Sequence, residues 1–417
     1  MEQKVTVVRW TSGTQVVKPA TLVVPVAARI RTRRCANISE ADMIGKISRR
    51  CALSLLGALG FVAAPTVLRP SNAEAQTGAA PARRKVALAL QGGGSHGAFT
   101  WGVLERLLDD ATMDIIGVTG TSAGAMNGAV LVDGLVRGGP EQARAQLRRF
   151  WEGVGTMPGF GRFFSNMSGE QAATTPLESI PAYVEAKNLS PYDLPGSTDN
   201  PMRRLLTELI DFDRLRSQRE IQLTICAINA RSARRRVFTD QDISVEALLA
   251  SACLPQLFRA VDIDGEPYWD GALAGNPALG PLLTRRPDCD LIIVRVDPVN
   301  RPEAPRSLPD ILNRTVEISH NSTFWLELAT IAIVQRFVDD ALSPFGHDRF
   351  HIVEASPIME RFPRSSKLNN YPPLLEYLFN LGRQTADAWM AQNGDAVGQR
   401  STMDVQQLLP GSIWDNI

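Results

Sequence analysis

A glycine-rich motif between an apolar run and an amphipathic segment is the first feature that could do chemistry. Its residues are Gly92, Gly93, Gly94, Ser95, His96 and Gly97. Glycines at such a junction let backbone N–H groups converge on a small anion, and the positive end of the following helix dipole adds attraction. The anion is either a phosphate or the oxyanion that forms when an ester carbonyl is attacked. The motif alone leaves both targets open.

The phosphate interpretation has a partial match, since the glycines at 92–97 also satisfy the dinucleotide-binding pattern G-x-G-x-x-G. That pattern requires an acidic residue at the end of the second strand, where it holds a ribose. Here Asp114 begins the second expected strand and Thr119 and Gly120 end it. A phosphate-binding P-loop also needs a Gly-Lys-Ser/Thr run, which does not follow the glycines. Nucleotide binding is therefore disfavoured.

A serine in a second motif could act as a nucleophile. This motif lies between the second expected strand and the second expected helix, and it consists of Gly120, Thr121, Ser122, Ala123 and Gly124. A serine on a tight strand-to-helix turn is held clear of the backbone, and flanking glycines relieve the crowding. The pattern is weak by itself. However, both glycine motifs fall at strand-to-helix junctions, in consecutive βα units. A chance occurrence of both motifs at such positions is improbable.

The serine needs a base, because a hydroxyl is a poor nucleophile until its proton is removed. Asp270 is the candidate. It follows the run at 265–269 and precedes Gly271 and Ala272, so it is expected to leave a strand into a glycine turn. From there its carboxylate could face Ser122 directly. Asp-Gly is also a common turn pair, and alone this segment indicates only an ordinary turn.

In this order, the three motifs resemble those of the patatin-like phospholipases. The similarity covers roughly residues 85–290, with weaker support to about residue 395. It implies a patatin-like α/β fold in which Ser122 is the nucleophile and Asp270 the general base of a Ser–Asp dyad. The reaction implied is hydrolysis of a lipid acyl ester through an acyl-enzyme, without a metal or an organic cofactor.

The same resemblance assigns the oxyanion hole to the glycine motif. The backbone N–H groups of Gly93 and Gly94, with Ser95 as a third candidate, are the implied donors. One departure stands out, because the family usually carries Arg or Lys where His96 stands. A histidine is only partly charged near neutral pH, so attraction for a phosphate head group is weakened. We therefore expect other acyl esters, including neutral lipids or polyesters, to be accepted.

Two other classes of function are open alternatives. A Ser–Asp–His hydrolase is allowed by chain order, since Ser122 and Asp270 are followed by His320, His347 and His351. However, an α/β-hydrolase normally places its nucleophile after several strands, whereas here it follows the second. The other alternative is a non-catalytic lipid-binding or partner-binding protein on a retained hydrolase scaffold. The intact motifs favour the enzyme.

Alternating strand and helix patterns place these motifs. A buried-strand pattern at Val86–Leu90 ends in the first motif, and apolar residues at helical spacing follow over 97–110. A strand over Asp114–Thr119 ends in the second motif, and a helix over 123–136 follows. This alternation predicts a three-layer α/β/α fold with a mostly parallel sheet. Further strands are expected at 221–228, 235–239, 291–296 and 350–353, and further helices at 140–153, 201–210, 244–252, 308–340 and 372–392.

The composition is that of an ordinary folded protein, with 44% hydrophobic and 21% charged residues. Residues 1–75 carry 11 Lys and Arg against 4 Asp and Glu, so the remainder of this chain of zero net charge is mildly acidic. No basic surface for nucleic acid is indicated. The five cysteines have irregular gaps that suit neither a zinc site nor a disulfide framework. Cys226 and Cys253 lie in apolar runs and are expected to be buried thiols.

An export signal is expected within residues 1–75. Arg49 and Arg50 precede an apolar stretch over 51–68, and a small-x-small site at 73–75 follows. This order is typical of a bacterial signal peptide, and the arginine pair favours the twin-arginine route. Because such signals normally begin near the first residue, we expect Met43 to be the true start. A periplasmic location follows, or a cytoplasmic or membrane-associated one if the signal is not used.

The expected organisation has four parts: the upstream segment and signal at 1–75, a linker at 76–84, a patatin-like acyl hydrolase domain at 85–395 and a tail at 396–417. Within the domain, an irregular stretch contains a cluster of large apolar residues, namely Met157, Phe160, Phe163, Phe164 and Met167. The cluster is either a lid or peripheral membrane contact, or a satellite core beneath a loop. Asn276-Pro277 is expected to be a turn that stiffens the loop after Asp270.

Overall fold

The computed structural model describes residues 83–157, 167–174, 190–193, 200–285, 288–301, 303–337, 348–355 and 358–405. The expected export signal, nearly all of the linker and the last part of the tail lie outside these residues. So do Phe160, Phe163 and Phe164 of the apolar cluster, as well as His347. Within the described part, no helix is both long enough and apolar enough to cross a membrane.

A single mixed sheet forms the centre of the described fold, with the strand order β5-β6-β3-β2-β1-β7-β8 and β4 paired to β3. The strands from β3 to β8 along this order are parallel, whereas β4 and β6 run antiparallel to β3, and β5 antiparallel to β6. The prediction of a mostly parallel sheet is confirmed. The strands are β1 (Arg84–Leu90), β2 (Met113–Gly120), β3 (Gln222–Asn229), β4 (Arg235–Thr239), β5 (Val261–Ile263), β6 (Glu266–Asp270), β7 (Asp290–Arg295) and β8 (Arg349–Glu354).

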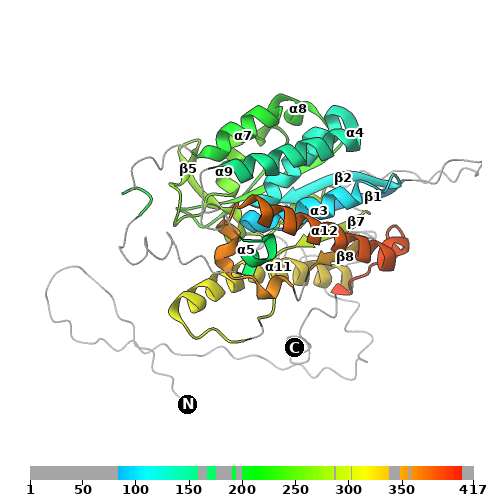
Figure 1. Ribbon diagram of the computed structural model, residues 1–417. Coiled ribbons are helices and arrows are strands. Elements are labelled where there is room, and N and C mark those ends of the chain that lie inside the picture. Colours follow the sequence, from blue (N-terminus) through cyan, green and yellow to red (C-terminus); the bar gives the residue numbers. More distant parts are fainter. Residues whose placement is uncertain are drawn as a thin grey trace, which may run out of the picture. The chain divides into compact units, whose positions relative to one another are not determined.

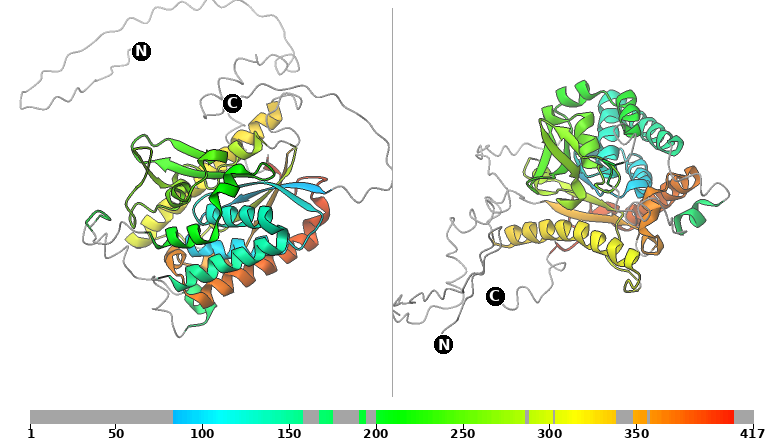
Figure 2. Two further views of the ribbon diagram at one scale, coloured as in Figure 1. Left: turned by 90° about the horizontal axis from the view of Figure 1, so that it is seen from above. Right: turned by 90° about the vertical axis from the view of Figure 1, so that its left-hand side faces the viewer.

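Helices cover both faces of this sheet, as Figures 1 and 2 show. Parallel strands are joined by right-handed crossovers, so connections that run in opposite directions along the sheet lie on opposite faces. Accordingly α3 and α4 connect β1, β2 and β3 on one face, where α12 also packs, and α11 connects β7 to β8 on the other. The helices are α3 (Gly97–Leu107), α4 (Ala123–Thr156), α5 (Gly169–Thr174), α7 (Pro201–Leu209), α8 (Phe212–Ser217), α9 (Val245–Ser251), α10 (Gly280–Leu283), α11 (Leu308–Phe337) and α12 (Pro372–Asn393).

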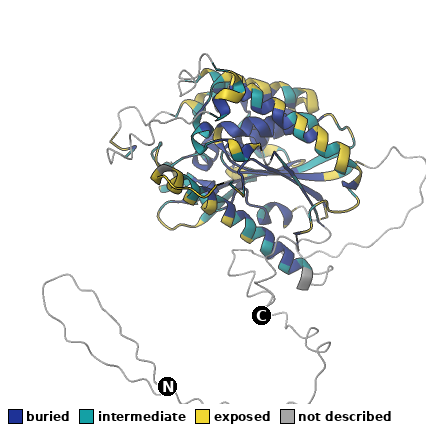
Figure 3. Cartoon of the chain, turned by 60° about the horizontal axis from the view of Figure 1, so that its bottom comes forward, coloured by how far each residue is buried: buried dark blue, intermediate teal, exposed yellow. Residues whose placement is uncertain are grey.

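The core lies between the sheet and these helices. Figure 3 shows the strands as buried and the outward sides of the helices as exposed. All five residues of Val86–Leu90 are fully buried, which explains why β1 is a continuous apolar run rather than an alternating one. The helix α4 contains both helices expected at 123–136 and 140–153, because the backbone leaves helical geometry only at Gly138 and Gly139, before Pro140.

The chain continues to pack on the fold beyond residue 395, where a tail was expected. The backbone N–H of Gly398 donates to Asp290 Oδ1 at 2.8 Å, and that of Thr402 donates to the Phe350 carbonyl at 3.0 Å. The side chain of Val397 is 1% exposed. Residues up to 405 therefore belong with the fold, since they cover the β8 end of the sheet.

Candidate active site

Ser122 lies on the turn between β2 and α4, as its motif predicted. Gly120 ends the strand, and Ala123 and Gly124 begin the helix. The serine has φ 54° and ψ −125°, a left-handed conformation that a residue with a side chain rarely adopts. Its backbone N–H donates to Ser251 Oγ at 2.9 Å. Such a strained turn holds the hydroxyl clear of the backbone at the carboxyl end of β2.

Strand register brings Asp270 to the same edge. Gly120 of β2 pairs with Ile225 of β3, and two residues further along β3, Ala227 pairs with Asp270 of β6. Because Ser122 also stands two residues beyond Gly120, the two side chains are level across the sheet. Asp270 is 3% exposed. Ser122 and Asp270 are far apart in the sequence. The antiparallel pairing of β6 with β3 brings Asp270 to the same end of the sheet as Ser122.

The carboxylate of Asp270 is positioned by the turn that follows it, the 3₁₀ helix η4 (Gly271–Leu273). The backbone N–H of Ala272 donates to Asp270 Oδ1 at 2.9 Å. The carbonyl oxygen of Gly271 accepts from the thiol of Cys226 at 3.8 Å. Gly271 and Ala272 therefore act through the backbone, and the Asp-Gly-Ala turn fixes the orientation of the carboxylate.

Burial raises the pKa of Asp270 above its ordinary value. Three effects oppose this rise: hydrogen bonding from the Ala272 N–H, the charges of His320 and Arg364, and hydrogen bonding from the Ser122 hydroxyl. A carboxylate with a raised pKa is a stronger base, which is what removal of a serine proton requires.

The glycine motif packs directly against Ser122. A Cβ added to Gly92 would lie 2.7 Å from the Ser122 Cβ, closer than real Cβ atoms come. The backbone N–H of Gly92 donates to Asn276 Oδ1 at 2.8 Å and is therefore not a candidate oxyanion donor. Gly92 is needed because a side chain at this position would collide with Ser122. The next N–H groups along the loop, those of Gly93 and Gly94, are the candidate oxyanion donors.

The rest of the motif forms the start of α3. Ser95 and His96 are buried in the 3₁₀ helix η1 (Gly94–His96), and Gly97 is the first residue of α3. A Cβ at Gly97 would lie 2.8 Å from the Ala123 Cβ, so the glycine motif and the serine motif meet here as well.

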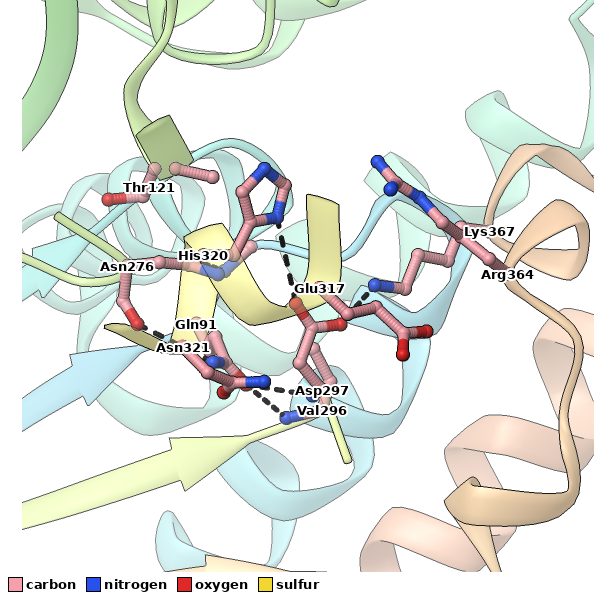
Figure 4. A network of polar contacts seen from close by, with 12 residues as sticks. Gln91, Thr121, Asn276, Val296, Asp297, Glu317, His320, Asn321, Arg364 and Lys367 are labelled. Carbon is pink, nitrogen blue, oxygen red and sulfur yellow. Dashed lines mark hydrogen bonds and ion pairs between the residues drawn. The ribbon is translucent and has the colours of Figure 1, made fainter. Parts of the chain in front are cut away.

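Polar contacts tie the glycine motif and the loop after Asp270 to the sheet (Figure 4). Thr121 Oγ1 donates to the Gly275 carbonyl at 2.7 Å. The side-chain oxygen of Gln91 accepts from the backbone N–H groups of Val296 and Asp297, both at 2.8 Å. With the Asn276 contact, these bonds hold all three motifs in one rigid frame. Asn276 therefore does more than stiffen a turn, and a long-range contact of this kind leaves no local signal in the sequence.

His96 does not carry the partial charge expected from the sequence. It is 2% exposed, and burial, with a contribution from the nearby Lys367 charge, lowers its pKa from 6.5 to about 3. Its Nε2 lies 2.8 Å from Ser366 Oγ. The expectation was wrong because it took the ordinary pKa of a solvated imidazole. In the fold this side chain is neutral and faces the interior.

The other histidines differ in position. His351 is fully buried in β8, where its Nε2 lies 2.8 Å from Asp290 Oδ1 and its Nδ1 lies 3.0 Å from Thr402 Oγ1. Both ring nitrogens are thus engaged in structural contacts. His320 lies on α11 with its Nδ1 3.8 Å from Asp297 Oδ2, the contact drawn as a dashed line in Figure 4. Of the described histidines, only His320 remains a candidate third member of a triad.

The buried thiols are confirmed. Cys226 and Cys253 are free and buried, and desolvation raises the pKa of both thiols to about 12. Within the described ranges, no cluster of three or more His, Cys, Asp or Glu side chains could hold a metal ion. Met167 packs partly buried against the core, while the phenylalanines expected beside it lie outside the described residues.

Comparisons with known proteins agree with the motif order. The family model described as patatin-like phospholipase matches residues 88–283, which span the glycine motif, Ser122 and Asp270. A search of curated proteins gave no significant match. Similar solved structures include VipD from Legionella pneumophila, with 15% identity, a TM-score of 0.30, and coverage of 74% of this chain and 67% of that one.

A second similar structure is the heterodimeric ExoU–SpcU complex from the type III secretion system of Pseudomonas aeruginosa. It has 18% identity and a TM-score of 0.26, with coverage of 58% of this chain and 50% of the matched chain. Neither structural similarity carries weight at these scores, and the assignment rests on the sequence match together with the mixed, mostly parallel sheet. This match identifies residues 88–283 as a region of the patatin-like phospholipase family.

Proposed function

We propose that this chain hydrolyses lipid acyl esters through an acyl-enzyme, with Ser122 as the nucleophile and Asp270 as the general base. The observation that carries the proposal is the strand register that brings Ser122 level with Asp270, whose carboxylate is buried and whose pKa is raised by that burial. The glycine motif that packs against the same serine supports it independently. The match of residues 88–283 to the patatin-like phospholipase family supports the substrate class.

In the first half-reaction, Ser122 Oγ attacks the ester carbonyl carbon and its proton passes to Asp270. The carbonyl oxygen becomes an oxyanion, which the N–H groups of Gly93 and Gly94 stabilise, aided by the N-terminus of α4 behind the serine. Collapse of this intermediate breaks the bond to the alcohol, and Asp270 returns the proton to the departing oxygen. The acyl group remains bonded to Ser122.

In the second half-reaction, water attacks the acyl-enzyme and gives its proton to Asp270. The new oxyanion lies in the same place and is stabilised by the same groups. When it collapses, the fatty acid leaves and Asp270 returns the proton to Ser122 Oγ. One carboxylate thus serves as base and acid in turn, and the cycle needs no histidine.

A Ser–Asp–His mechanism is the second candidate, since the charge of His320 acts on Asp270. Separate substitutions of His320, His347 and His351 by Ala distinguish the two. A dyad predicts that each variant, if folded, keeps kcat/KM within about tenfold of wild type. A triad predicts a loss of at least about a thousandfold for one of them. Loss of all turnover in Ser122→Ala excludes the third alternative, a lipid-binding protein without catalysis.

We also propose that residues 43–75 act as a twin-arginine export signal, which would deliver the enzyme to the periplasm. The support is the order of Arg49-Arg50, the apolar stretch and the small-x-small site at 73–75. Replacing Arg49 and Arg50 by Lys should retain the protein in the cytoplasm, as measured by cell fractionation. Periplasmic recovery of that variant at wild-type level would contradict the proposal, and amino-terminal sequencing of the mature protein locates the cleavage site.

A further inference from the structure

The loop that follows Asp270 is held at its far end by a glutamate of α11. The two carboxylate oxygens of Glu327 have different partners. Its Oε2 accepts the backbone N–H of Leu279 at 2.6 Å, and its Oε1 pairs with the guanidinium of Arg235 at the start of β4. Both charged side chains are largely buried, with 12% of Glu327 and 22% of Arg235 exposed. One carboxylate thus joins three segments that are far apart in the sequence.

Arg235 also touches the middle of the same loop. A Cβ added to Gly275 would lie 3.1 Å from Arg235 Nη1, so the guanidinium packs directly on the backbone there. The Arg235–Glu327 ion pair therefore contacts the loop at two places, Gly275 and Leu279. Charge-assisted hydrogen bonds are roughly twice as strong as neutral ones, which suits this pair to hold a loop in one position.

The part of the loop between these two contacts is bonded to both glycine motifs. The carbonyl oxygen of Gly275 accepts from Oγ1 of Thr121, the residue directly before the nucleophile, at 2.7 Å. Next in sequence, Asn276 Oδ1 accepts the backbone N–H of Gly92 at 2.8 Å. Figure 4 shows Thr121 and Asn276 in the same polar network. A shift of this part of the loop would therefore move the nucleophile turn and the candidate oxyanion loop together.

The helix that supplies Glu327 meets the dyad loop at its near end as well. α11 packs against η4, the turn that orients the carboxylate of Asp270. This helix begins at Leu308, beyond residue 283, where the family match ends. The support of the candidate site thus extends into a part of the chain that the match does not cover.

We propose that Glu327 is a positioning residue for the reaction at Ser122. It acts through the loop after Asp270 and does not touch the substrate. This inference rests on the proposed function and adds a residue on which its rate depends. A misplacement of about 1 Å can cost about a hundredfold in rate, so partial release of the loop is enough to lower turnover.

The first test measures steady-state hydrolysis of p-nitrophenyl butyrate well below the melting temperature. Glu327→Gln keeps one side-chain oxygen but loses the charge that pairs with Arg235, so kcat should fall about tenfold while KM stays at the wild-type value. Arg235→Lys keeps a cation opposite Glu327 and should lose less activity than Arg235→Gln. The control Glu376→Gln changes an exposed glutamate on α12 and should leave kcat unchanged.

The second test follows the glycine loop without using turnover. Hydrogen exchange of the Gly92 amide reports its bond to Asn276, because a bonded amide must open before it exchanges. In Glu327→Gln this amide should exchange at least about tenfold faster than in the wild type, since the loop that holds it is released. In Glu376→Gln it should exchange at the wild-type rate.

A lower melting temperature of Glu327→Gln with wild-type kcat and wild-type exchange at Gly92 would assign the residue to stability alone and overturn the inference. A fall in kcat without faster exchange, or a rise in KM at unchanged kcat, would overturn it as well. If Glu327→Gln does not fold, Arg235→Lys decides by the same two measurements. The proposed function is judged separately: turnover that persists in Ser122→Ala would end it, and exchange at Gly92 would still decide whether Glu327 holds the loop.

Discussion

Gly92 and Ser122 are in such close contact that a Cβ on the glycine would lie 2.7 Å from the serine Cβ and equally close to the Thr121 carbonyl oxygen. The glycine motif after β1 and the serine motif after β2 are therefore built against each other, with no room for a side chain between them. The N–H of Gly92 is held by Asn276 Oδ1. This contact sets where the following N–H groups lie relative to the serine hydroxyl.

Gly92→Ala should consequently lower kcat by about a hundredfold to a thousandfold, the loss typical of removing an oxyanion donor. The added methyl meets backbone and the nucleophile itself, so the loop must shift. Gly394→Ala is the matched control, because its Cβ would meet only the end of the Met390 side chain at 3.4 Å. Steady-state kinetics on a soluble ester measures both. Wild-type kcat in Gly92→Ala would show that the loop does not position the donors.

Asp270→Asn should abolish turnover and raise the melting temperature at pH 8. Burial raises the pKa of Asp270 in the folded state, so its stabilising contribution is present at low pH and is lost as pH rises through the folded pKa. Ionising this buried carboxylate as pH rises destabilises the folded wild type, whereas Asn stays neutral and its side-chain oxygen still accepts the Ala272 N–H.

Thermal unfolding at pH 4 and pH 8 measures this effect. The gain in melting temperature from Asp270→Asn should be larger at pH 8 than at pH 4, because the raised pKa lets the folded wild type take up a proton on this carboxylate as pH falls. Asp395→Asn, at an exposed position, serves as the control and should show no such difference. A lower melting temperature for Asp270→Asn at pH 8 would contradict the assignment.

His96→Gln should reduce the loss of unfolding free energy that the wild type shows as pH falls below about 6.5. The folded pKa of about 3 lies below the ordinary value of 6.5, so the unfolded chain binds the proton first and stability is lost as pH falls below about 6.5. Gln keeps an N–H donor for Ser366 and does not titrate. Urea unfolding at pH 6.5 and pH 4.5 should therefore show a smaller loss for the variant than for wild type, and equal losses would refute a neutral buried imidazole.

The sequence predicts the elements that contain the motifs because their signals are local. The buried run of β1, the second strand and the helix breaks at Gly138 and Gly139 are all set by nearby residues. The short strand β5 (Val261–Ile263) was missed, since three residues carry no readable periodicity. Its existence depends on pairing with β6, which is a tertiary contact.

The candidate site divides in the same way. Ser122 and Asp270 are marked by glycine turns in the sequence, whereas Ser251, Asn276 and Ser366 bond to the site from distant segments without any motif. The charge state of His96 was mispredicted for the same physical reason: a pKa depends on burial, and burial of a polar residue next to glycines is decided by packing across the fold.

Covalent trapping of Ser122 tests the central claim most directly. A fluorophosphonate should label the wild type at Ser122 alone, as located by peptide mass spectrometry, and should leave Ser122→Ala unlabelled. In Asp270→Asn the labelling rate should fall at least about a hundredfold, since the serine has lost its base, while Asp395→Asn labels at the wild-type rate. Labelling of Ser122 in Asp270→Asn at the wild-type rate, or labelling at a different residue, would contradict the dyad.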